Sequence, residues 1–186
     1  MSQSYQIEGH NLKEISEEIF HDQEDIVLVD REKIEFLKRK AINNRRKRAR
    51  LCAHKDTDDP VHEMIIVHAR GNYIPPHKHI NKSESFHLIE GSVDLVFFDD
   101  EGEIIRVLSM GSDASGKIFY YRIPESVYHS LIVTSDVVVF HEVTKGPFIR
   151  SETIFGAWAP HENDAEAAKI YMKHLRERLE EVKSVS

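Results

Sequence analysis

The chain has one cysteine, Cys52, and no long run of apolar residues. A single cysteine excludes a disulfide within the chain and fits a reducing compartment. The longest apolar runs, such as those in SLIV and DVVVF, are far shorter than the ~20 residues that span a bilayer. The N-terminus lacks a basic region followed by an apolar run, so we expect no secretory signal peptide. These absences predict a cytoplasmic protein that does not insert into membranes.

The chain also lacks an excess of positive charge, because its formal net charge is −7 at pH 7. This balance argues against a general affinity for polyanions. One segment, KRKAINNRRKRAR at 38–50, is locally basic, with eight lysines or arginines among its 13 residues. It holds no aromatic residue on which a base could stack. We interpret it as the solvated end of a helix followed by a turn, and we expect no nucleic-acid partner.

What the chain does contain divides it into four zones. Residues 1–25 form a polar extension, weakly ordered or partly helical, and 26–50 form a helical segment with Asp30 as its N-cap. Residues 51–161 carry seven short β-rich runs separated by turn signals, which is typical of an antiparallel sandwich or barrel. Residues 162–186 form an amphipathic helix with a narrow apolar stripe. That stripe either docks on the β domain, which we favour, or forms a coiled-coil seam between chains.

Two histidines separated by one residue lie in GNYIPPHKHINKSESFHLIEG, at 71–91. On an extended chain His77 and His79 point to the same side, about 7 Å apart at the backbone. Glu84 follows after a stretch that can turn the chain, and His129 begins a later β-rich run. Three imidazoles and one carboxylate suit one divalent ion, either Fe, Mn, Ni, Co or Zn, and the ligand types do not choose among these metals.

Other histidines fall on β-rich runs as well. His87 alternates with Phe86 and Leu88, so we expect it to face away from Glu84. His62 and His68 share one face of their run, and the sequence leaves their role open.

The segment resembles the first motif of the cupin superfamily, G-x5-H-x-H-x4-E-x6-G. It matches that motif at every fixed position: Gly71, His77, His79, Glu84 and Gly91. The second cupin motif is matched at Pro124 and His129.

A closer resemblance covers about 26–161. The stretches DPVHEMIIVHARGNYIPPHKH, FFDDEG, VVVFHEVTKGPF and WAPHE are similar to the WbuC family of cupin-fold metalloproteins. The resemblance implies a mainly β fold, a cupin double-stranded β-helix or jelly-roll barrel, here flanked by an N-terminal and a C-terminal helix. It places the metal near the open end of the barrel, on His77, His79, Glu84 and His129. Members of that family often occur with genes for O-antigen synthesis, which implies a link to surface-polysaccharide synthesis.

A second group of candidate residues lies in RARLCAH. If this stretch is extended, Arg48, Arg50 and His54 share one face and reach the mouth of the barrel. Arginine there grips a carboxylate or phosphate of a small-molecule ligand. The WbuC family also carries basic residues and a histidine in this stretch.

Three classes of function follow. The first is a metal-dependent isomerase or epimerase that acts on a small polar substrate, sugar-like or bearing a carboxylate or phosphate. The second is an Fe(II)-dependent dioxygenase with the same ligands. The third is a non-catalytic binding or regulatory protein, because the sequence identifies no catalytic residue besides the metal ligands. Since jelly-roll cupins commonly pair through their sheets, we expect a homodimer.

Overall fold

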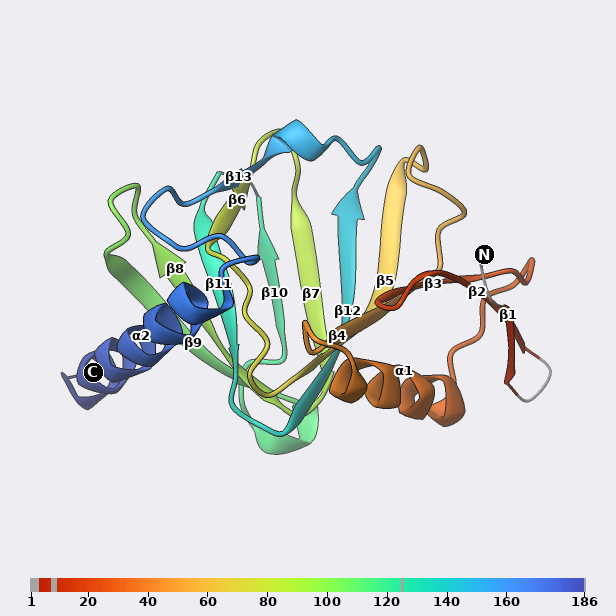
Figure 1. Ribbon diagram of the computed structural model, residues 1–186, viewed down its shortest axis with the longest axis horizontal. Coiled ribbons are helices and arrows are strands. Elements are labelled where there is room, and N and C mark those ends of the chain that lie inside the picture. Colours follow the sequence, from red (N-terminus) through yellow and green to blue (C-terminus); the bar gives the residue numbers. More distant parts are fainter. Residues whose placement is uncertain (1–3, 8–9, 125, 186) are drawn as a thin grey trace.

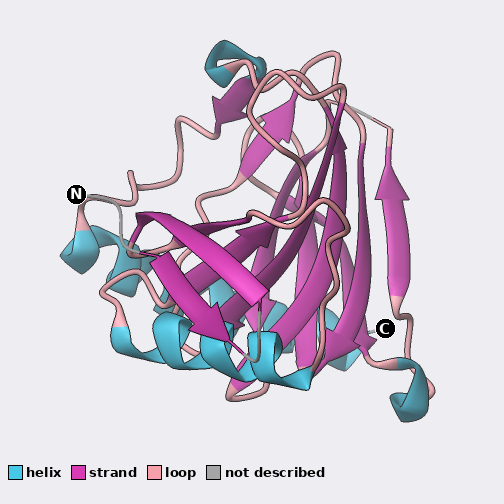
Figure 2. Cartoon of the chain, turned by 90° about the vertical axis from the view of Figure 1, so that its right-hand side faces the viewer, coloured by secondary structure: helices cyan, strands magenta, loops and turns pink. Residues whose placement is uncertain are grey.

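The computed structural model describes residues 4–7, 10–124 and 126–185, which form two facing β-sheets with a helix outside each of them (Figures 1 and 2). Within these residues the larger sheet has eight strands, in the spatial order β1 (Ser4–Ile7), β2 (His10–Ser16), β3 (Ile19–Asp22), β4 (Arg48–Cys52), β5 (Val61–Ala69), β12 (Val137–Lys145), β7 (Glu84–Glu90) and β10 (Tyr120–Ile123). The smaller sheet has five, in the order β13 (Thr153–Phe155), β6 (His77–His79), β11 (Tyr128–Val133), β8 (Ser92–Phe98) and β9 (Ile104–Gly111). The predicted fold class, a mainly β jelly roll with flanking helices, is confirmed.

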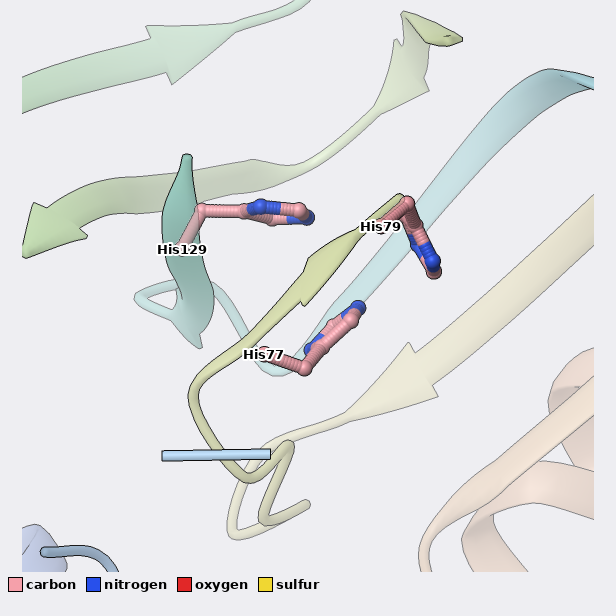
Figure 3. Close-up of side chains that lie close together, drawn as sticks. All are labelled: His77, His79 and His129. Atoms are coloured by element: carbon pink, nitrogen blue, oxygen red, sulfur yellow. The ribbon is translucent and has the colours of Figure 1, made fainter. Parts of the chain in front are cut away.

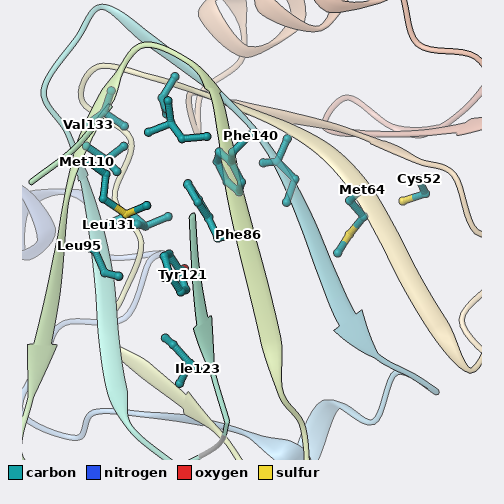
Figure 4. Close-up of a cluster of buried hydrophobic side chains, with 14 residues drawn as sticks. Cys52, Met64, Phe86, Leu95, Met110, Tyr121, Ile123, Leu131, Val133 and Phe140 are labelled. Atoms are coloured by element: carbon teal, nitrogen blue, oxygen red, sulfur yellow. The ribbon is translucent and has the colours of Figure 1, made fainter. Parts of the chain in front are cut away.

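The core lies between the two sheets because their inward-facing residues are apolar. Phe86 of β7 stacks on Phe140 of β12 and on Tyr121 of β10, with ring centroids 4.1 and 5.1 Å apart (Figure 4). Leu95 and Leu131 meet them from the smaller sheet. This cluster fills one part of the barrel and leaves the other part to polar residues.

The helix α1 (Arg31–Asn43) covers the outer face of the larger sheet. The carboxylate of Asp30 accepts a hydrogen bond from the backbone N–H of Lys33, so Asp30 is the N-cap that the sequence predicts. Phe36 and Leu37 are buried against Leu51 and Val67 of the sheet. The helix is shorter than the predicted segment 26–50, because the chain turns after Asn43 and enters β4.

The N-terminal region corrects the prediction for 1–25. Its described residues form strands β1, β2 and β3, where we had expected a weakly ordered or partly helical extension. Leu12 and Phe20 are completely buried beneath α1, and β3 pairs in parallel with β4. The sequence contains too few apolar residues here to show a strand pattern, since the neighbouring sheet and helix supply most of the buried surface.

The helix α2 (Ala165–Val185) packs on the outer face of the smaller sheet (Figure 1). Its apolar stripe, including Met172, Leu175 and Leu179, is buried against Val96 and Phe98 of β8. The stripe is therefore used within the chain, as the docking interpretation predicts. Two short 3-10 turns, η1 (Asp113–Ser115) and η2 (Arg150–Glu152), complete the described fold. No helix among the described residues is both long and apolar enough to cross a membrane.

Candidate metal centre

Three histidines from two neighbouring strands converge inside the barrel. His77 and His79 leave β6 on the same side, and His129 of β11 lies opposite His77 in the register of the two strands. One ring nitrogen of each histidine lies within 4.8 Å of the corresponding atoms of the other two. Figure 3 shows the three rings gathered around one point. The alternation of the two strands thus brings together residues that are about 50 positions apart in the chain.

Glu84 reaches these histidines from the opposite sheet. It begins β7, is 6% exposed, and places its two carboxylate oxygens 3.1 Å from His129 Nε2 and 3.2 Å from His79 Nε2. The Tyr121 hydroxyl donates a hydrogen bond of 3.2 Å to the same carboxylate. All four residues that the sequence singled out as metal ligands therefore lie together.

In each of the three histidines, the Nδ1 atom has a polar partner of its own. The Nδ1 atoms of His77 and His129 lie 2.9 and 3.0 Å from the carbonyl oxygens of Pro75 and Val127. A carbonyl oxygen only accepts, so each Nδ1 carries the proton and each Nε2 faces the centre. The Nδ1 of His79 lies 3.2 Å from the Thr153 hydroxyl on β13. Backing of this kind orients imidazoles that bind metals through Nε2.

Glu84 and His129 shift each other's pKa values. Burial by itself would raise the pKa of Glu84, but the adjacent His129 and His79 outweigh it and hold that pKa well below its usual value. Burial by itself would lower the pKa of His129, and the Glu84 carboxylate outweighs it and raises that pKa. The carboxylate is thus charged and attracts a cation. A divalent ion fits this set because the Glu84 carboxylate supplies negative charge beside the three imidazoles, and because mixed imidazole and carboxylate ligands suit such ions.

The four residues border a cavity of about 440 Å³ between the two sheets. Its wall also includes Leu131, Tyr121 and Phe140, which belong to the core, so the cavity ends on the apolar cluster. Its volume matches that of small-molecule sites, which usually range from about 300 to 1,000 Å³.

Of the predicted ligand-binding residues Arg48, Arg50 and His54, only two line the cavity. Arg50 and His54 line the cavity, whereas Arg48 does not. Arg48 Nε donates a hydrogen bond of 2.7 Å to Glu18, and its guanidinium lies 3.4 Å from Glu162. Arg48 lies on the same face of β4 as Arg50, but it does not line the cavity, because acidic residues from the N-terminal strands and from the segment before α2 bind its side chain.

Several residues that line the cavity were missed or left open by the sequence analysis. His62 and His68, whose role was open, both line it, while His87 is exposed and faces outward as predicted. Glu142 and Thr144 were missed, although they alternate with the buried Phe140 along β12, and that alternation was a usable signal. Lys82 of the loop between β6 and β7 and His21 of β3 also line the cavity and were missed.

Glu142 has an unusual electrostatic environment. Burial and the nearby Glu84 carboxylate raise its pKa to about 7, against the opposing effects of Lys82 and Arg50. A carboxyl group with this pKa exchanges a proton near neutral pH.

Comparison with known proteins gives one family model, a domain of unknown function (DUF6016), which matches residues 29–110. No curated protein sequence matches the chain. The match spans α1, β4 to β8 and all of β9 except Gly111, and therefore includes the strands that carry His77, His79 and Glu84 but not the strand that carries His129.

Solved structures similar to this chain include three bacterial proteins. Protein SO0799 from Shewanella oneidensis is 14% identical with a TM-score of 0.45, over 55% of this chain and 66% of that chain. The capsular polysaccharide assembling protein CapF from Staphylococcus aureus is 20% identical with a TM-score of 0.45, over 57% and 34%. Oxalate decarboxylase from Bacillus subtilis is 18% identical with a TM-score of 0.44, over 61% and 28%. The chain spans less than two thirds of the length of each, and what these proteins bind or do does not transfer to it.

Proposed function

We propose that this protein binds one divalent metal ion through His77, His79, Glu84 and His129 and acts as a metal-dependent enzyme on a small polar substrate. The observation that carries the proposal is the convergence of three backed imidazoles and a charged carboxylate at the wall of a 440 Å³ cavity. The ligand set suits Fe, Mn, Ni, Co or Zn.

A divalent ion held there supplies Lewis-acid chemistry, because it polarises a carbonyl group or chelates neighbouring oxygens of a ligand. The chain's own residues supply the rest. Tyr121, the Thr153 hydroxyl and the two backing carbonyls orient the four ligands, and the core cluster closes one end of the cavity and excludes water there. Glu142, a carboxyl group on the wall of the same cavity, accepts or donates a proton on the substrate. Isomerisation or epimerisation needs these two functions, a polarised carbonyl and a proton carrier.

The resemblance to the WbuC family extends this proposal. It supports a sugar or sugar derivative as substrate and a role in surface-polysaccharide synthesis. The pairing of sheets that is common among jelly-roll cupins supports a homodimer, and the single cysteine supports a cytoplasmic location.

The first test is metal analysis by plasma mass spectrometry on protein purified without an affinity tag. We expect nearly one metal ion per chain in the wild type and almost none in the variant His77→Ala/His79→Ala. The matched control is His87→Ala/His174→Ala, which removes two exposed histidines and keeps the metal. A wild type that holds no metal and takes up none on titration contradicts the proposal.

The identity of the metal then decides between the enzyme classes. Iron, together with oxygen consumption on adding a candidate substrate, would replace the isomerase proposal with a dioxygenase. A tightly bound metal without turnover of any polar substrate would favour a non-catalytic binding protein.

A further inference from the structure

Two positive side chains that line the cavity lack a carboxylate partner. Among the described residues, neither Arg50 nor Lys82 has an acidic oxygen within the 4.0 Å of an ion pair, and Arg50 makes no side-chain hydrogen bond. The neighbouring basic residues differ, since Lys38, Lys40, Arg46 and Arg48 are all paired with glutamates. Arg50 and Lys82 are therefore two cations on the cavity wall that have no carboxylate partner among the described residues.

Both cations are placed by the fold at the same cavity. Arg50 lies on β4 opposite Ile66 of β5. Two residues further along β4, Cys52 lies opposite Met64 of β5, and Met64 lies opposite Glu142 of β12. Lys82 lies in the loop that joins β6 to β7, with Nζ 5.8 Å from the centre of the Phe148 ring. The Lys82 side chain is partly buried and lines the cavity. A cation shielded from water is costly unless a counter-ion approaches it, so a ligand that supplies negative charge would stabilise this arrangement.

Three residues of the wall also have a polar atom without a partner. Among the described residues, His62 Nε2, His68 Nδ1 and Thr144 Oγ1 make no hydrogen bond, although these residues are only 4%, 7% and 3% exposed. His62 and Thr144 lie opposite each other on β5 and β12, and Glu84 is next to Thr144 on β7. A buried polar atom without a hydrogen bond is costly, so these atoms are open to a hydrogen bond from a bound molecule, either water or a ligand.

The charges of the wall favour a particular ligand class. When the histidines are neutral and both carboxyl groups are ionised, the charges of Arg50 and Lys82 balance those of Glu84 and Glu142 in the wall. A divalent ion on the four ligands would leave two positive charges uncompensated. A ligand with two negative charges neutralises the cavity, whereas an uncharged sugar does not.

We propose that the cavity binds a small ligand bearing two negative charges, a phosphate monoester or a dicarboxylate, through Arg50 and Lys82, with His62 and Thr144 bonded to its remaining oxygens. The two-charge preference rests on the proposed metal function, whereas anchoring by Arg50 and Lys82 does not require it. The ligand class therefore deepens the proposed function and can be tested separately from it.

The test is isothermal titration of the metal-loaded protein with inorganic phosphate and with malonate, and with glucose as the uncharged probe. We expect phosphate or malonate to bind and glucose not to bind at the same concentration. Arg50→Gln and Lys82→Gln should each weaken binding of the anion about tenfold or more, because each removes a charge-assisted hydrogen bond. Phosphate binding better than malonate identifies a phosphate-bearing ligand, and the reverse order identifies a dicarboxylate.

The matched controls are Arg122→Gln and Lys117→Gln, which remove exposed charges outside the cavity and should leave affinity unchanged. Arg50→Lys keeps the charge but loses the guanidinium fork, so it should fall between wild type and Arg50→Gln. Thermal unfolding and metal content of every variant are measured alongside. Equal affinity in wild type, Arg50→Gln and Lys82→Gln, or no anion binding at all, would overturn the inference.

The same titration on His77→Ala/His79→Ala separates this inference from the metal proposal. Weaker anion binding that still depends on Arg50 supports the anchor even if the wild type holds no metal. Metal at one ion per chain with anion affinity independent of Arg50 and Lys82 leaves the proposed function standing and refutes the anchor.

Discussion

Single residues in the barrel owe their properties to their neighbours. His77 and His68 are both buried histidines, yet His77 lies among the candidate ligands with its Nδ1 on a backbone carbonyl, while His68 packs edge-on against Phe140 with a ring-centroid distance of 5.2 Å. Arg48 and Arg50 are two positions apart on one strand, and only Arg48 has carboxylates beside it. The role of each of these residues therefore depends on its surroundings and not on its residue type alone.

His68 gives a pH prediction that is independent of any metal. Burial, with a smaller contribution from Arg50, lowers its pKa to about 3 from the ordinary 6.5. The unfolded chain binds a proton at His68 below pH 6.5 and the folded chain does not, so this contribution to stability is complete above pH 6.5 and is lost as pH falls towards 3. We expect His68→Leu to flatten the pH dependence of the free energy of unfolding over this window, by up to about 1.4 kcal/mol per pH unit.

Urea denaturation at pH 7, 6, 5 and 4 measures this effect. The control, His174→Leu, changes an exposed histidine of α2 and should retain the wild-type slope. A slope for His68→Leu that equals the wild-type slope would show that His68 does not contribute.

At the scale of elements, turns decide where the ligands lie. β7 carries Glu84 at its start and ends at Gly91, from which the chain reverses into β8. Gly91 has φ +84°, and a Cβ built on it would lie 2.2 Å from the carbonyl oxygen of Val137. Gly71, the other glycine that ends the motif, has φ +88° and no atom within 4 Å of such a Cβ. Gly91 is therefore required both by its backbone conformation and by the lack of space for a Cβ, and Gly71 is required by its backbone conformation alone.

This difference predicts unequal effects of the same substitution. Gly71→Ala should cost about 1 kcal/mol of unfolding free energy, the cost of a left-handed backbone in a residue with a Cβ. Gly91→Ala should cost at least about 2 kcal/mol, because the strand pair between β7 and β12 must also move. Urea denaturation of the two variants side by side tests this, and equal costs would show that the close contact at Gly91 relaxes freely.

At the scale of the whole molecule, the candidate site joins the two sheets. The three histidines come from the smaller sheet and Glu84 from the larger, so an ion bound by all four would link them. Homodimer formation and any partner chain stay predictions of the resemblance.

Metal binding should therefore stabilise the folded chain. After treatment with a chelator, adding Mn²⁺ or Zn²⁺ at 100 times its dissociation constant should raise the free energy of unfolding by about 2.7 kcal/mol. Thermal unfolding of His77→Ala/His79→Ala should not respond to the same addition. A wild-type melting temperature that is insensitive to metal, at concentrations where metal analysis shows binding, would contradict a link between the sheets.

The sequence by itself determined the local features. The alternation of His77 and His79, the N-cap at Asp30, the outward direction of His87 and the mainly β class all follow from periods of two or 3.6 residues or from the chemistry of single side chains. The four candidate ligands were also marked by their spacing and by the resemblance to cupins.

Only the tertiary structure decided which charged residues face the cavity. Arg48 lies outside the cavity because Glu18 and Glu162, which are distant in sequence, bind its guanidinium. Lys82 lines the cavity because of the course of its loop, and Glu142 lines it because β12 pairs with β5 and β7. The strands at residues 4–7, 10–16 and 19–22 likewise exist because the sheet and α1 bury Leu12 and Phe20. These contacts join residues that are far apart in the sequence, so the local sequence pattern does not predict them.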